Sequence, residues 1–168
     1  ALDILVKLEH RGAVSADGKT GDGAGILIEI PHDFFVKNCD FDLPEFHEYA
    51  VGMVFLPKKE NQLTFCVSTF ENEIERQGLS ILGWRDVPVD QSQVGAIAAQ
   101  TEPHVKQIFV GKGDEKLSEQ EFNTKLFIAR KVAEHQIKAS KLSQAEYFYL
   151  PSFSTHTLIY KGLLTPED

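Results

Sequence analysis

The sequence predicts a mixed α/β (α+β) fold, in which helices stack on one sheet as a small α/β sandwich. Three observations lead to this prediction. Short apolar runs alternate with helical patterns from His32 to about Ser152, which is the element order of a layered domain. A glycine-rich loop at residues 18–25 leads into a near-continuous apolar run that is typical of a buried strand. The longest helical pattern begins with a capping box, a signature of a helix start.

The first elements are expected before His32. Residues 1–9 carry Leu, Ile and Val at intervals of three and four, which predicts a helix, and Gly12 follows as a stop. Because this helix would begin without a cap, we expect further residues upstream of it. The apolar run from Ile26 to Ile30 predicts a strand that ends at Pro31.

The longest helix has the clearest pattern. Ser118 and Glu121 have the spacing of a capping box, in which each side chain bonds the other residue's backbone N–H. The inward-facing stripe that follows is expected at Phe122, Leu126, Ala129, Ala133 and Ile137.

Shorter patterns predict the remaining elements. Strands are expected at 49–56, 79–87, 105–110, 147–150 and 157–161, and helices at 61–77 and 92–101. The carboxylates of Glu71, Glu73 and Glu75 are expected on a solvated face of the first of these helices.

Size and composition limit the class of protein. A chain of 168 residues can bury one good core, or one core plus a smaller satellite. No apolar run approaches the roughly 20 residues that span a bilayer, and no signal peptide opens the chain, so we expect a cytoplasmic protein without a membrane partner. The formal net charge of −8 disfavours nucleic acid as a partner.

Cysteine and histidine spacing gives no metal site. Cys39 and Cys66 belong to no CxxC or Cys/His cluster and are expected to be plain reduced thiols. Surface or capping roles are expected for five histidines without metal-ligand spacing: His32, His47, His104, His135 and His156.

The glycine loop Gly21-Asp22-Gly23-Ala24-Gly25 allows several interpretations. A dinucleotide fingerprint needs a strand before the glycines and a helix after them, and the order here is the reverse, so nucleotide binding is disfavoured. A tight turn with positive φ and an active-site wall both remain open. Taken alone, His10-Arg11-Gly12 is favoured as a charged helix end.

Together the two motifs are more specific. His10-Arg11-Gly12 followed by Thr20-Gly21-Asp22-Gly23-Ala24-Gly25-Ile26 resembles the glutamine amidotransferase domain that opens the glutamate synthase large subunit, a class II, N-terminal-nucleophile enzyme. The resemblance covers essentially all 168 residues. Further similar segments are Ile30–Phe35, Gly83–Val89, Phe127–Arg130, Ser154-Thr155 and Ile159–Glu167.

The resemblance implies a domain organisation. The fold would be a partial N-terminal-nucleophile αββα sandwich with an inserted α/β sandwich. Residues 1–31 and 152–168 would be segments of the amidotransferase core, and residues 32–151 would be an inserted α/β subdomain.

The resemblance also implies supporting residues for the active site. Arg11 would help to hold the environment of the N-terminal cysteine, and Gly12 would offer a backbone carbonyl near the free amine of that cysteine. The free amine is the local base for its own thiol in such enzymes. Gly21, Asp22 and Gly23 would support the same site.

The catalytic parts that the family implies are missing from the sequence. Position 1 is Ala1, with no Cys-Gly pair, and the arginine clamp and Asn-Gly oxyanion donors would follow the Thr165-Pro166-Glu167 region. Without them we expect an inactive fragment, because the transition state would lack its stabilising groups.

For the parent enzyme, the resemblance implies release of ammonia from glutamine for the reductive synthesis of glutamate from 2-oxoglutarate. FMN and an iron–sulfur cluster would lie on later domains, with no cofactor in this chain. The partners would be glutamine and the remainder of the glutamate synthase chain, and NADPH, NADH and ferredoxin stay open as electron donors. The alternative is a stand-alone, non-catalytic interaction or regulatory module derived from the same domain.

Overall fold

The computed structural model describes residues 7, 13–21, 23–92, 94–113 and 116–163, and the chain divides into two compact units. The larger unit consists of Ile28–Val87 and Pro103–Leu158. The smaller unit consists of Ala1–Leu27, Pro88–Glu102 and Ile159–Asp168. The helix expected over residues 1–9 lies outside the described residues except for Lys7.

The larger unit is built on a four-stranded antiparallel sheet of order β3-β4-β2-β5. Its strands are β2 (Tyr49–Leu56), β3 (Ser80–Asp86), β4 (His104–Gly111) and β5 (Tyr149–Ser154). The mixed α/β prediction is therefore confirmed, and both sheets of the described chain are antiparallel.

Strand β2 is the inner strand with the most apolar sequence. It pairs with β4 over its whole length, from Tyr49 opposite Gly111 to Leu56 opposite His104. All its residues except Phe55 are buried. A continuous apolar run is typical of a strand that is covered on both faces. The predicted bounds of this strand, 49–56, are confirmed.

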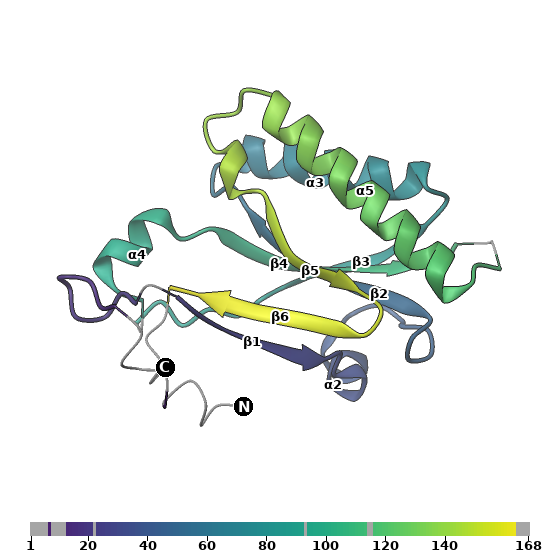
Figure 1. Ribbon diagram of the computed structural model, residues 1–168, viewed down its shortest axis with the longest axis horizontal. Helices are drawn as coiled ribbons and strands as arrows, with labels where there is room; N and C mark the ends of the chain where they lie inside the picture. Colours follow the sequence, from purple (N-terminus) through teal and green to yellow (C-terminus); the bar gives the residue numbers. More distant parts are fainter. Residues whose placement is uncertain (1–6, 8–12, 22, 93, 114–115, 164–168) are drawn as a thin grey trace. The chain divides into compact units, whose positions relative to one another are not determined.

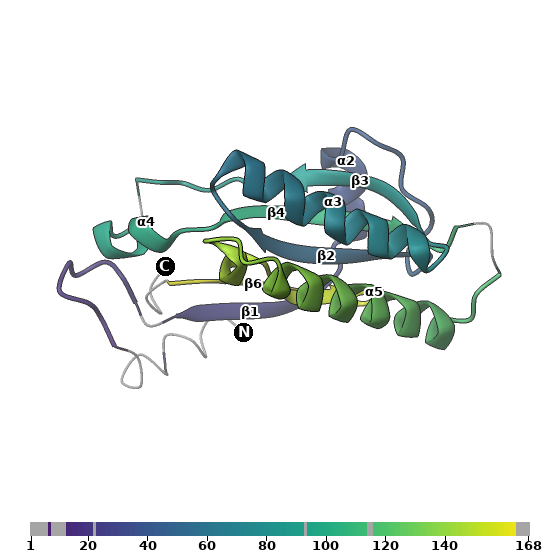
Figure 2. The ribbon, with the colours of Figure 1, turned by 90° about the horizontal axis from the view of Figure 1, so that it is seen from above.

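Two helices cover one face of this sheet, α3 (Glu60–Arg76) and α5 (Glu119–Ala139) (Figure 1). Seen from above, they run side by side across the strands (Figure 2). Between helices and sheet lies one hydrophobic core, to which β2, α3 and α5 contribute Val54, Phe70 and Phe122, all fully buried.

The start and the stripe of α5 are as predicted. Ser118 Oγ accepts a hydrogen bond from Glu121 N at 3.3 Å, and Glu121 Oε2 accepts one from Ser118 N at 2.9 Å, which completes the capping box. All five residues of the predicted inward stripe are buried: Phe122, Leu126, Ala129, Ala133 and Ile137.

The prediction of a solvated carboxylate face on α3 was wrong for Glu73. This residue is buried, and its Oε1 accepts hydrogen bonds from Arg76 at 2.8 Å and from Gln136 of α5 at 2.9 Å. Glu71 is half-buried and accepts a hydrogen bond from the Trp84 indole at 2.7 Å. Only Glu75 is exposed.

The opposite face of the sheet carries a helix that the sequence did not predict, α2 (His32–Asn38). Its buried residue, Phe35, packs edge-on against Phe109 of β4 with 4.9 Å between ring centroids. Phe109 also contacts the rings of Phe41 and Tyr49.

Other boundaries differ from the prediction by a few residues. The expected strand at 147–150 begins later, because Ala145–Tyr147 form a 3₁₀ turn, η2, before β5. The expected helix at 92–101 is shorter, with α4 running over Ala96–Thr101. No helix in the described part of the chain is both long and apolar enough to cross a membrane.

Strands β1 (Ala24–Glu29) and β6 (Thr157–Gly162) form a second, two-stranded sheet. They are antiparallel, since Gly25 faces Tyr160 and Lys161 while the later residue Ile30 donates its N–H to the earlier His156 O at 2.9 Å. The two strands are neighbours although most of the chain lies between them.

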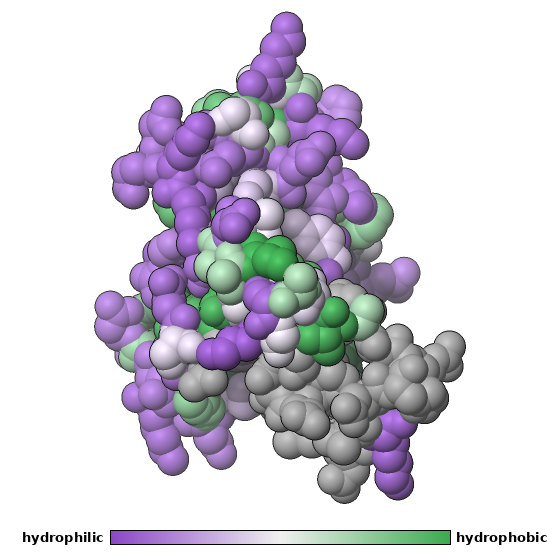
Figure 3. All heavy atoms as spheres, turned by 90° about the vertical axis from the view of Figure 1, so that its left-hand side faces the viewer, coloured by the Kyte–Doolittle hydropathy of each residue, from purple (hydrophilic) through white to green (hydrophobic). Residues whose placement is uncertain are grey.

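Helix α4 belongs to the smaller unit. It buries Ala98 and leaves Ile97 43% exposed. Figure 3 views the molecule from the side that carries α4 and shows a small group of apolar side chains among polar ones. The helix therefore offers solvent part of its apolar surface.

Candidate functional site

Residues 14–21 form a closed turn in the smaller unit. Val14 and Gly21 pair as an antiparallel bridge, and Ser15 N donates to Thr20 O at 2.8 Å. Gly18 has a φ of 67°, in the left-handed region that glycine adopts without steric cost. The turn connects the two sequence motifs, because His10-Arg11-Gly12 precedes Val14 and the glycine loop begins at Gly21.

The Asp17 carboxylate organises this turn. Its Oδ1 accepts hydrogen bonds from Thr20 N at 2.8 Å and Lys19 N at 3.1 Å, and its Oδ2 accepts one from the Thr20 hydroxyl at 2.6 Å. The Thr20 hydroxyl, followed by the Ile97 and Thr20 amides, holds the pKa of Asp17 far below its ordinary value. The carboxylate is therefore charged throughout the physiological pH range.

The same two side chains contact the first turn of α4. Asp17 Oδ2 accepts a hydrogen bond from Ile97 N at 3.0 Å, and Thr20 Oγ1 accepts one from Ala98 N at 3.2 Å. Amides at a helix start have no partner within the helix, so these side chains act as its cap from a distant part of the chain.

Gly95 makes this contact possible. It is the N-cap residue of α4, is buried, and makes no side-chain cap. A Cβ at this position would clash with Thr20 Oγ1 and would lie 2.7 Å from Asp17 Oδ2. Only glycine allows the turn and α4 to approach so closely.

The glycine loop packs against β6. Gly23 has a φ of 126°, which confirms the predicted positive φ in this loop. A Cβ on Gly25 would lie 2.9 Å from Tyr160 O and 3.0 Å from Lys161 Cβ. Glycine at position 25 therefore permits close approach between β1 and β6.

Of the five residues predicted for the site, the structure describes two, Gly21 and Gly23. Arg11, Gly12 and Asp22 lie outside the described residues. Gly21 is buried and pairs with Val14, and Gly23 is exposed at the start of β1. The predicted roles of all five residues in catalysis stay predictions.

Sequence reasoning missed the residues that connect the turn to α4. Asp17 followed by Gly18, with Thr20 three residues after Asp17, is a common turn pattern and could have been recognised. The contact from Asp17 to Ile97 spans 80 residues, and no local pattern in the sequence predicts it.

Both cysteines are free, and their surroundings do not activate them. Burial raises the pKa of Cys66 to about 11. Burial also raises the pKa of Cys39, against the opposing effect of the Arg85 charge. A nucleophilic thiol needs a lowered pKa or an adjacent base, so neither residue has the environment of a nucleophile.

Two of the described histidines each pair with a single carboxylate. His156 Nε2 lies 2.7 Å from Glu119 Oε1, and His104 Nε2 lies 2.9 Å from Asp86 Oδ1. Among the described residues, no group of three or more His, Cys, Asp or Glu side chains is placed to hold a metal ion.

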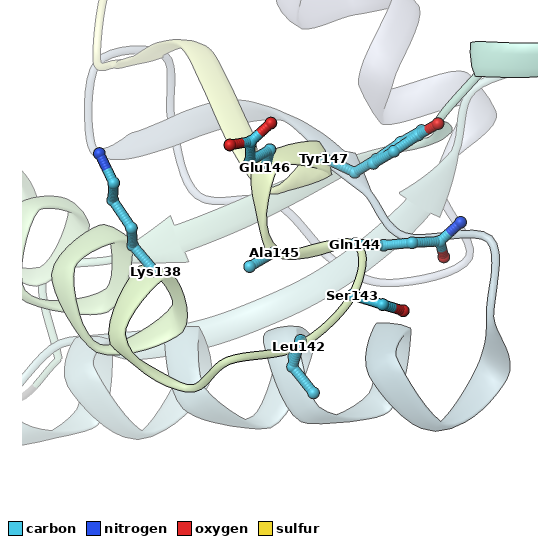
Figure 4. Close-up of a pocket in the computed structure, with 7 residues that line it drawn as sticks. All are labelled: Lys138, Leu142, Ser143, Gln144, Ala145, Glu146 and Tyr147. Atoms are coloured by element: carbon cyan, nitrogen blue, oxygen red, sulfur yellow. The ribbon is translucent and has the colours of Figure 1, made fainter.

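One surface depression of the larger unit, of about 320 Å³, lies at the connection from α5 to η2 (Figure 4). Lys138 and Glu146 point to one side of this loop, while Ser143 and Gln144 point away from Lys138. The Ser143 hydroxyl accepts a hydrogen bond from Gln62 Nε2 at 2.9 Å, and the backbone N–H of Gln144 donates one to Gln62 Oε1 at 2.9 Å. None of the lining residues belongs to the predicted motifs.

Comparison with known proteins defines the class. The family model described as class-II glutamine amidotransferases matches residues 1–168. The match spans the two motifs, the turn between them and the paired strands β1 and β6. The chain therefore belongs to the class-II glutamine amidotransferase family.

Named relatives narrow the similarity further. The glutamate synthase (NADPH) large chain of Bacillus subtilis is 41% identical over 168 residues, which cover 99% of this chain and 11% of the relative. The glutamate synthase (NADH) of Saccharomyces cerevisiae is 43% identical over 177 residues, which cover 98% of this chain and 8% of the relative. Ferredoxin-dependent glutamate synthase 1 of Arabidopsis thaliana is 38% identical over 170 residues, which cover 99% of this chain and 10% of the relative. The chain thus spans about a tenth of the length of these relatives.

Proposed function

We propose that this chain is part of the glutamine amidotransferase domain of a glutamate synthase. The parent enzyme would hydrolyse glutamine and use the ammonia to make glutamate from 2-oxoglutarate. The observation that carries this proposal is the closed turn at 14–21, which connects His10-Arg11-Gly12 to the glycine loop in a chain of this family.

The turn follows the first motif directly, because Gly12 is two residues from Val14 in the sequence. Val14 in turn pairs with Gly21. In the proposed site Gly12 would offer its carbonyl to the free amine of an N-terminal cysteine in the parent protein. Arg11 would hold the surroundings of the thiol, and Gly21, Asp22 and Gly23 would line the site.

The domain organisation is part of the proposal. Residues 1–31 and 152–168 would be segments of an N-terminal-nucleophile αββα sandwich, and residues 32–151 would be an insertion. Its support is the pairing of β1 with β6, which are adjacent strands although most of the chain separates them.

The iron–sulfur cluster of the parent enzyme does not fit this chain. An iron–sulfur cluster is held by about four thiolates, and the chain contains two cysteines, of which Cys66 is buried in α3. The cluster would therefore be held by other parts of the parent protein, where the family resemblance also places FMN, and we derive no step through either group.

The test uses the full-length parent protein. We expect it to release glutamate from glutamine, and Arg11→Ala to lower kcat/KM for glutamine by about 100-fold, because a small misplacement of the thiol is costly at this scale. Glutamate formation with added ammonia in place of glutamine should be retained. Lys19→Ala is the matched control, because it removes an exposed cation from the turn.

Two results would overturn the proposal. One is a wild-type protein that releases no glutamate from glutamine. The other is an Arg11→Ala variant with the kcat/KM of the wild type for glutamine.

A further inference from the structure

Segment Pro88–Glu102 lies between β3 and β4 in the chain, yet it belongs to the smaller unit. Within that unit, its α4 is hydrogen-bonded to the turn at 14–21 through Asp17 and Thr20. A segment from the middle of the chain is therefore attached to the turn that connects the two amidotransferase motifs.

The hydrogen bonds at this contact use every polar atom of the two side chains. Thr20 is 3% exposed, and its hydroxyl donates to Asp17 Oδ2 while accepting from Ala98 N. Asp17 Oδ2 accepts from both the Thr20 hydroxyl and Ile97 N. Because two donors face the same oxygen, an amide NH₂ in that place would put a donor against donors.

The contact also depends on the shape of the backbone. Gly95 leaves no room for a side chain against Thr20 and Asp17, and α4 has no side-chain cap of its own. Polar backbone groups that are buried without a partner cost free energy, so the first turn of α4 depends on the turn at 14–21.

We propose that Asp17 and Thr20 are positioning residues for the proposed glutaminase site, because they attach segment Pro88–Glu102 to the turn that carries the site's motifs. This inference rests on the proposed function. The segment acts as a brace: it restrains the Val14–Gly21 bridge, from which Gly12 lies two residues away on one side and Asp22 one residue away on the other. Neither side chain is assigned contact with the substrate.

The experiment compares variants of the full-length parent protein. Asp17→Asn keeps an acceptor oxygen for the Lys19 and Thr20 amides but places its NH₂ donor against the N–H of Ile97. Gly95→Ala separates the two segments sterically. Thr20→Ser keeps the hydroxyl and serves as the conservative variant. Gln91→Ala is the matched control, since Gln91 bonds Glu102 within the same segment at 3.2 Å and does not contact the turn.

Two measurements are made on each variant: hydrogen exchange at the Ile97 and Ala98 amides, and glutamine hydrolysis. Asp17→Asn and Gly95→Ala are expected to speed exchange at both amides at least tenfold and to lower kcat for glutamine about tenfold or more, since small misplacements of a site are costly. Thr20→Ser and Gln91→Ala should remain near wild type. Ammonia-dependent glutamate formation should be unchanged in all four, which separates positioning from loss of folding.

The outcomes separate this inference from the proposed function. Faster exchange with unchanged glutamine hydrolysis overturns the positioning role, and unchanged exchange in Asp17→Asn overturns the contact itself. A wild-type protein that does not hydrolyse glutamine overturns the proposed function, and the positioning role with it. If Gly95→Ala also loses ammonia-dependent activity, that variant is misfolded, and the result for Asp17→Asn alone tests the positioning role.

Discussion

Glu73 lies in the contact between α3 and α5, where its carboxylate accepts hydrogen bonds from both helices. The sequence prediction grouped it with Glu71 and Glu75 on one solvated face. Residues two apart on a helix point about 200° away from each other, so Glu73 cannot share a face with the other two. Position within the helical period, more than residue type, places this carboxylate at the interface.

Replacing Glu73 tests that placement. Glu73→Ala is expected to lower the free energy of unfolding by about 1–3 kcal/mol, because the half-buried Gln136 amide loses its acceptor. Glu75→Ala, two residues away and exposed, is the control and should change it by less than about 0.5 kcal/mol. Urea denaturation of the two variants measures the difference, and equal effects would contradict the buried position.

Burial of Cys66 makes the free energy of unfolding depend on pH in the alkaline range. In the unfolded chain its thiol titrates near the ordinary pKa of 9.0, whereas burial raises the folded pKa to about 11. Below pH 9 both states are protonated and the contribution is fully present. Between pH 9 and 11 only the unfolded state releases the proton, so the free energy of unfolding should fall by about 2–3 kcal/mol.

Urea denaturation at pH values from 8 to 11 measures this decrease. Cys66→Ala should remove the contribution of Cys66 between pH 9 and 11, while the decrease caused by Cys39, whose pKa burial also raises, should remain. The decrease caused by Tyr49, whose pKa burial raises from 10.0 to about 12, should remain and begin about one pH unit higher. A Cys66→Ala protein with the pH profile of the wild type would refute the assignment.

Among the elements, α5 contributes most of the helical side of the core. Its stripe places Phe122 and Leu126 in the core with exposed fractions of 0% and 1%, while the neighbouring Phe127 is 60% exposed. Phe122→Ala and Leu126→Ala should each lower the free energy of unfolding by about 2–5 kcal/mol, because each leaves a cavity. Phe127→Ala, the same kind of truncation on the outer face, should have little effect on urea denaturation. Similar losses at all three positions would show that the stripe is misplaced.

The elements predicted well from the sequence are those with one unbroken pattern. β2 is apolar throughout, and α5 has both a capping box and a regular stripe. Helix α2 was missed because Phe34, Phe35 and Val36 are consecutive apolar residues without a helical period. The start of β5 was misplaced because an apolar pair, Tyr147-Phe148, precedes it at the end of η2.

For the candidate site, local sequence predicted the positive φ in the glycine loop, but neither the packing of Gly25 against β6 nor what the turn at 14–21 contacts. Gly23 has a positive φ and Gly25 lies close to β6, and glycine tolerates both conditions. The attachment of Asp17 to α4 depends on how distant segments of the chain meet, and local periodicity carries no information about that.

For the whole molecule, the central question is whether these 168 residues can perform the chemistry of their family unaided. Under the proposed function, the reaction needs a thiol that is ionised or paired with a base. At pH 7 a pKa of about 11 leaves roughly one Cys66 in ten thousand as thiolate, and its side chain is fully buried. Cys39 also has a raised pKa, so burial disfavours thiolate formation at both residues.

We therefore expect a polypeptide of these 168 residues to release no glutamate from glutamine, and to form no adduct with an electrophilic glutamine analogue that targets thiols. Intact-mass measurement after incubation with the analogue tests this directly. Iodoacetamide in urea is the control: unfolding exposes both thiols at their ordinary pKa, so the mass should rise by two additions, which shows that Cys39 and Cys66 were available and reduced. The parent protein, treated in the same way, should gain the analogue at its N-terminal cysteine under the proposed function. An analogue adduct on Cys39 or Cys66 of the folded polypeptide, or steady release of glutamate, would mean that this chain contains a nucleophile which its burial and hydrogen bonding do not reveal.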